Sequence, residues 1–142
     1  FLKGLNIDDT SISKVQACIL STIVPQSPAD LLEQIVCDAD LFHLGTDEFQ
    51  ERNRLMRKEF ETSSKTIVSK EEWRKGSIKL LQSHNYFTEY AKLLLNQTKQ
   101  ENLERLLQKQ QDVLEKNSNM LLVENKTETI TEKPSKKKNS FN

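Results

Sequence analysis

Apolar and polar positions follow each other along most of the chain with the period of an α-helix. Apolar residues recur three and four positions apart in several stretches, and prolines, glycines or small polar residues separate these stretches. The predicted helices span residues 11–22, 31–45, 46–60, 69–82 and 89–116. Only three glycines and three prolines occur in the 142 residues, too few for the turns of an all-β fold. The sequence therefore predicts an all-α fold.

The stretch 31–45 carries the strongest helical pattern. Ser27 is predicted as its N-cap with Pro28 in the first turn, and Gly45 is predicted to end it. Its inner face is defined by apolar residues at helical spacing, which are Leu32, Ile35, Val36, Ala39 and Phe42. Further leucines cover much of the remaining circumference. The pattern predicts a helix that is buried nearly all round.

Four side chains in this apolar helix are titratable and could bind a metal or take part in catalysis. Glu33 and Asp40 fall on one shoulder of the helix with His43 nearby, and Asp38 falls on the opposite shoulder. A buried carboxylate requires a compensating partner, which is either a positive group of the fold or a bound metal. Spacing alone leaves both a structural pairing and a metal or catalytic role open.

Two local signals mark the second half of the chain. Ser69 and Glu72 form a capping box, the clearest helix start in the sequence. Residues 83–85 interrupt the helical pattern, and we expect His84 in this break to be structural or exposed.

The composition limits which classes of partner and which cellular compartment the sequence favours. Twenty-one basic and 21 acidic residues give a formal net charge of zero, so nothing indicates nucleic acid as a partner. No run of 18 apolar residues occurs, and no membrane span is predicted. Cys18 and Cys37 lack metal-ligand spacing and are expected to be free thiols in a reducing compartment, which favours the cytoplasm.

The chain changes character towards its end. Residues 1–116 are assigned to a helical domain, and residues 117–142 to a flexible polar and basic tail or linker. The last 18 residues are mostly Thr, Glu, Lys, Ser and Asn, and they include the run Lys136-Lys137-Lys138. Such a composition cannot bury enough apolar surface to offset the entropy cost of ordering.

The segment 35–45, Ile-Val-Cys-Asp-Ala-Asp-Leu-Phe-His-Leu-Gly, resembles the last motif of the HD-domain metal-dependent phosphohydrolases. Residues 22–33 before it and 73–88 after it also resemble this superfamily. Its members hold a divalent metal with a histidine, an adjacent His-Asp pair and a distant aspartate on a later helix. The resemblance implies that Asp40 is this last metal ligand, with Glu33 and His43 as candidates for the shell around it.

The function implied by the resemblance is metal-dependent hydrolysis of a small-molecule phosphate ester, such as a nucleotide or cyclic nucleotide. The metal, which the resemblance does not resolve among Mg, Mn, Co and Zn, would polarise the phosphoryl group and activate a bound water. No His-Asp dipeptide occurs in the sequence, so the other three ligands are absent. We therefore expect the chain to be the C-terminal half of an HD-type domain from a longer protein, inactive by itself.

The alternative is a non-catalytic HD-fold module for helical interaction or an effector role. The motif looks closest to bacterial HD proteins, some of which join a membrane module as Pycsar-type effectors. This resemblance implies a cytoplasmic domain that a membrane module beyond the C-terminus could tether to the inner membrane. An upstream His-Asp dipeptide would favour the enzyme, and its absence would favour the module.

Overall fold

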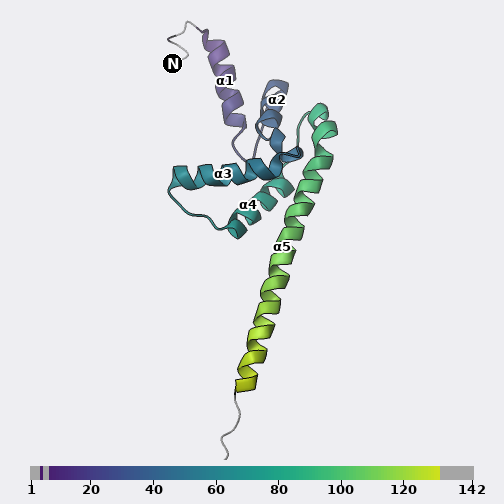
Figure 1. Ribbon diagram of the computed structural model, residues 1–142. Helices are drawn as coiled ribbons and strands as arrows, with labels where there is room; N and C mark the ends of the chain where they lie inside the picture. Colours follow the sequence, from purple (N-terminus) through teal and green to yellow (C-terminus); the bar gives the residue numbers. More distant parts are fainter. Residues whose placement is uncertain (1–3, 5–6, 132–142) are drawn as a thin grey trace, which may run out of the picture. The chain divides into compact units, whose positions relative to one another are not determined.

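The computed structural model describes the backbone of residues 4 and 7–131 and the side chains as far as Met120. All regular structure in this part of the chain is helical, which confirms the predicted all-α fold. The elements in chain order are α1 (Asp9–Ser21), α2 (Leu31–Asp40), the 3-10 helix η2 (Phe42–Gly45), α3 (Phe49–Ser64), α4 (Lys70–Ser83) and α5 (Glu89–Thr131) (Figure 1). None of the helices among the described residues combines the length and apolar character required to cross a lipid bilayer.

The start of α4 agrees with its sequence signal, whereas α1 and α2 differ from the prediction. The capping box of α4 is confirmed, because Ser69 Oγ accepts from Glu72 N–H and Glu72 returns a bond to Ser69 N–H. Helix α1 starts at Asp9, before the predicted residue 11, and Asp8 is its N-cap. The N-cap of α2 is Asp30, not Ser27, since Asp30 Oδ1 accepts from Glu33 N–H at 2.9 Å. Asp30 directly precedes the first helical residue, so it is the side chain placed to reach the unpaired amides of the first turn.

The predicted helix 31–45 is divided in two. It leaves α-helical geometry at Leu41, and residues 42–45 form the tighter η2. Gly45 ends η2, as predicted, but it does so without a positive φ. It is required for close packing instead: a Cβ at this position would lie 2.5 Å from the main-chain oxygen of Leu95 in α5.

The main core lies where η2, α3, α4 and α5 meet. Its buried residues are Leu41, Leu44, Phe49, Ile78, Leu81 and Leu106. Asn102 of α5 is also buried, and its Nδ2 donates to the main-chain oxygens of Leu44 and Thr46 at 3.0 and 2.9 Å. This amide fastens α5 to the end of η2. The sequence pattern missed it, because residues 96–102 are a wholly polar stretch.

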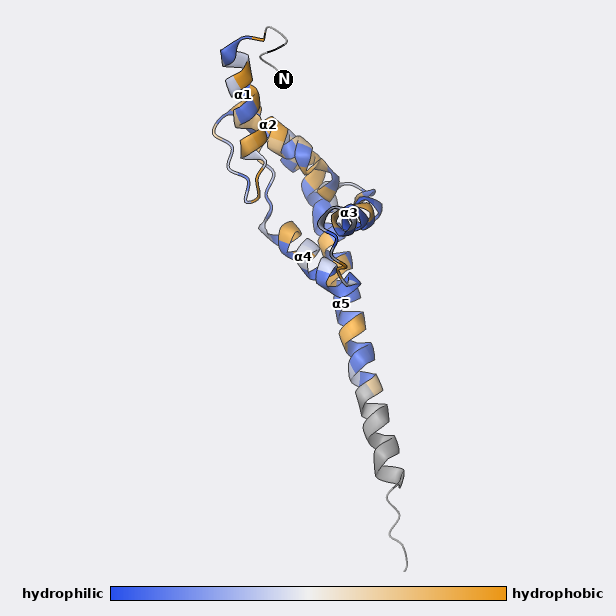
Figure 2. Cartoon of the chain, turned by 90° about the vertical axis from the view of Figure 1, so that its left-hand side faces the viewer, coloured by the Kyte–Doolittle hydropathy of each residue, from blue (hydrophilic) through white to orange (hydrophobic). Residues whose placement is uncertain are grey.

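The apolar surface of α1 and α2 is largely exposed. Leu31 and Ile35 of α2 keep 64% and 50% of their surface accessible, and Ile19 and Leu20 of α1 keep 62% and 64%. In the hydropathy colouring of Figure 2, hydrophobic segments recur along both helices. The prediction that the 31–45 helix is buried nearly all round is therefore wrong for the described residues. Its C-terminal part reaches the main core through Leu41 and Leu44, and Cys37 before it is also buried.

Helix α5 is longer than the sequence pattern predicts. It was expected to end at Lys116, and it continues to Thr131. The first proline after the helix starts is Pro134, so no helix-breaking residue interrupts this stretch. The boundary predicted at residue 117 falls inside α5, and the rest of the predicted tail, 132–142, lies outside the described residues.

Candidate functional site

The two aspartates of the Asp-Ala-Asp motif have different environments at the C-terminal end of α2. Asp38 is only 5% exposed. One of its oxygens accepts from Phe87 N–H at 2.8 Å, and the other accepts from the N–H and hydroxyl of Thr88 at 2.8 and 2.7 Å. Thr88 directly precedes α5 and in turn accepts from Ala91 N–H. Asp38 therefore holds the segment that starts α5, which is a structural role.

Asp40 is exposed to solvent. The one hydrogen bond found to its carboxylate from the described residues is a long one, 3.4 Å from Gln26 Nε2 to Oδ2. The same Gln26 nitrogen also donates to the main-chain oxygen of Cys37. Asp40 thus keeps most of its hydrogen-bonding capacity available, whereas three donors from the protein occupy Asp38.

His43 lies beside Asp40 on η2 and is half-buried. Burial and then the positive charge of Arg52 lower the pKa of His43, while the Asp40 charge and a hydrogen bond to the Asp40 main chain oppose this shift. An imidazole that is neutral at pH 7 retains a nitrogen able to accept a proton or bind a metal.

Asp40 and His43 line one open depression of about 650 Å³. The other residues around it are Ala39, Phe42, Thr46, Asp47, Glu48 and Arg52. The depression combines acidic side chains with one arginine that is paired to Glu48 at 3.1 Å. It is the place where the described residues bring two of the sequence-predicted site residues together.

Glu33 is engaged at the other end of α2. Its Oε2 accepts from Ala29 N–H at 2.7 Å, while its own N–H donates to Asp30. Together these bonds form the N-terminal cap of the helix. The residues that line the depression at Asp40 do not include Glu33. A role for Glu33 near a metal stays a prediction.

The residues described here do not complete a metal site. No group of three or more His, Cys, Asp or Glu side chains gathers in this part of the chain. By itself, Asp40 could offer a metal one carboxylate ligand, because it is exposed and weakly bonded. Further ligands would have to come from other residues.

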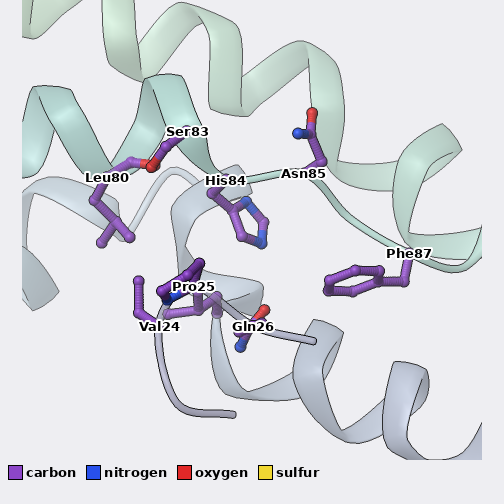
Figure 3. A pocket seen from close by; sticks show the side chains of 9 residues that line it. Val24, Pro25, Gln26, Leu80, Ser83, His84, Asn85 and Phe87 are labelled. Atoms are coloured by element: carbon purple, nitrogen blue, oxygen red, sulfur yellow. The ribbon is translucent and has the colours of Figure 1, made fainter. Parts of the chain in front are cut away.

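A second cavity lies next to Asp40, between the segment joining α1 to α2 and the segment joining α4 to α5. Its volume is about 180 Å³, and Gln26, Ser83, His84 and Asn85 are the polar residues that line it (Figure 3). The interruption of the helical pattern at residues 83–85 predicted a connecting segment. It did not decide whether His84 is structural or exposed. His84 is buried. Gln26 and His84 are far apart in the sequence, so no local pattern relates them.

Comparisons with known proteins found no match for the chain. No family model, no curated protein and no solved structure matches it.

Proposed function

We propose that this chain supplies the last metal ligand, Asp40, of an HD-type phosphohydrolase that acts on a nucleotide or another small phosphate ester. The observation that carries the proposal is the difference between the two aspartates of the motif. Asp38 is buried under three protein donors, whereas Asp40 is exposed beside His43 in an open depression. The resemblance of residues 35–45 to the HD motif selects the same aspartate.

The exposed apolar faces of α1 and α2 support the assignment to half of a domain. Large apolar side chains on both helices remain about half or more exposed, including Ile19, Leu20, Leu31 and Ile35. Exposed apolar surface of this extent usually marks an interface. In the proposal, the remaining helices of the HD-type core cover this surface and bring the other metal ligands to Asp40.

The second candidate is a non-catalytic module that uses the same apolar faces to bind a partner. The observation that favours it is the exposed apolar surface itself, because Ile19, Leu20 and Leu31 each keep 62–64% of their surface accessible. The two candidates differ in what Asp40 does. A ligand residue controls metal content, whereas an exposed aspartate of an interaction module does not.

In the proposal the chain is part of a longer protein, and the test is metal analysis of that protein, with Asp40→Ala and Asp47→Ala compared. Asp47 is the matched control, because it is an exposed carboxylate on the same depression that the motif does not mark as a ligand. We expect Asp40→Ala to lose bound divalent metal and hydrolysis of a phosphodiester probe together, while Asp47→Ala keeps both. Equal metal content in both variants and the wild type would reject the proposal and favour the interaction module.

A further inference from the structure

The cavity beside α2 contains buried polar atoms that the described chain leaves unpaired. Neither ring nitrogen of His84 has a hydrogen-bond partner among the described residues. The side-chain oxygen Oε1 of Gln26 also lacks one there. His84 is only 7% exposed. Figure 3 shows its ring pointing from the segment before α5 into the space above Pro25 and Gln26. Buried polar groups are normally satisfied, so these atoms indicate a missing partner.

The His84 ring is held in a fixed orientation. It makes an edge-to-face contact with Tyr86, with ring centroids 4.6 Å apart. The Tyr86 hydroxyl donates to the main-chain oxygens of Leu41 and Phe42, and Lys99 Nζ donates to the main-chain oxygen of His84. A binding group held by such contacts loses little freedom when a ligand arrives.

The charge state of the cavity restricts the ligand. Burial and then the charge of Lys99 lower the pKa of His84 to about 4, with Asp38 opposing and His43 adding to the shift. The ring is therefore neutral at pH 7 and presents one N–H donor and one nitrogen acceptor. The lining residues include no Asp, Glu, Lys or Arg, and they are Val24, Pro25, Gln26, Leu41, Leu80, Ser83, His84, Asn85 and Phe87. A charged ligand would lose its hydration without an opposite charge to replace it.

We propose that this cavity binds a small uncharged cyclic amide, whose adjacent N–H and carbonyl pair with Gln26 Oε1 and the His84 ring. The N–H of such a ring satisfies the unpaired amide oxygen, and its carbonyl accepts from the imidazole. The apolar residues around them, among them Pro25, Leu80 and Phe87, cover the faces of the ring. The volume of about 180 Å³ exceeds the roughly 30 Å³ share of one water several times over.

This chemistry is shared by free lactam rings and by nucleobases. The proposal does not rest on a metal at Asp40, although Gln26 contacts that residue. Binding to the cavity and metal binding can therefore be tested separately.

The experiment follows the ring nitrogens of the two histidines of the chain by nitrogen-detected NMR correlation while 2-pyridone is added. His43→Gln assigns the signals. We expect 2-pyridone to shift the His84 nitrogens, and N-methyl-2-pyridone, which lacks the N–H donor, to bind about tenfold more weakly. Uridine distinguishes the source: tighter binding than 2-pyridone indicates a nucleobase, and exclusion of uridine indicates a free heterocycle.

Variants distinguish binding in the cavity from binding elsewhere on the surface. His84→Phe and Gln26→Leu should each weaken 2-pyridone binding about tenfold or more. Ser83→Ala is the control, because Ser83 lines the same cavity but its hydroxyl donates to Leu80 in its own helix. Ser83→Ala should bind as the wild type does. No shift at His84 with either 2-pyridone or uridine, or equal binding of 2-pyridone and its N-methyl form, would overturn the proposal in favour of water filling the cavity.

Discussion

At the scale of single residues, the motif Asp38-Ala39-Asp40 contains one structural and one exposed carboxylate. The helical period placed the two on opposite shoulders of a helix but did not say which was buried. The partners of Asp38 are Phe87 and Thr88, which follow 49 and 50 residues later in the chain. A pattern within 15 residues carries no information on such a contact. The sequence located the carboxylates, and tertiary packing decided their roles.

We predict that Asp38→Ala destabilises the protein by about 3 kcal/mol, because three donors near the start of α5 lose a charged acceptor in a buried position. Asp40→Ala should change the free energy of unfolding by less than about 0.5 kcal/mol, since Asp40 is exposed. Urea unfolding of both variants measures the difference. Equal effects of the two substitutions would show that Asp38 is not the anchor of α5.

At the scale of elements, the sequence predicted where helices occur better than how they end and pack. The capping box at Ser69 and Glu72 was found because both partners lie within one turn. The break before α5 was also found at residues 83–85, where α4 ends. The packing requirement at Gly45 was missed, because it comes from Leu95, a residue on another helix.

Gly45 and Gly76 provide a matched pair of substitutions. Gly45→Ala should destabilise the protein by about 2–3 kcal/mol, because the new Cβ meets the main chain of α5 at Leu95 and either η2 or α5 must shift. A Cβ at Gly76, inside α4, meets nothing within 4 Å. Gly76→Ala should therefore stabilise α4 by about 0.5–1 kcal/mol through helix propensity. Thermal unfolding of both variants provides the test, and a neutral Gly45→Ala would mean that η2 and α5 are not in close contact.

At the scale of the whole molecule, the apolar pattern gave the fold class but overestimated burial. A helix that is apolar nearly all round was expected to be covered on every side, yet much of α1 and α2 is exposed in the described chain. The period of apolar residues indicates which face of a helix must be buried. It does not indicate which other residues pack against that face. The mismatch is consistent with an apolar surface that packs against residues other than those described here.

This mismatch leads to a prediction for Ile19→Lys combined with Leu31→Lys, two positions that are 62% and 64% exposed. In the 142-residue chain the pair should change stability by less than about 0.5 kcal/mol per site and reduce binding of a hydrophobic dye. In a longer protein whose core covers these faces, each substitution should cost about 1.5–3 kcal/mol, the value of burying such a side chain.

Leu93→Lys is the control for this comparison, because Leu93 lies on α5 and is 87% exposed. It should leave stability within about 0.5 kcal/mol in both proteins, since the prediction assigns cover to the faces of α1 and α2 and not to this position. Chemical unfolding of the short and long proteins, each with and without the substitutions, completes the test. If Ile19→Lys and Leu31→Lys are as harmless in the long protein as Leu93→Lys, those faces remain exposed there. The other helices of an HD-type core would then not pack on them.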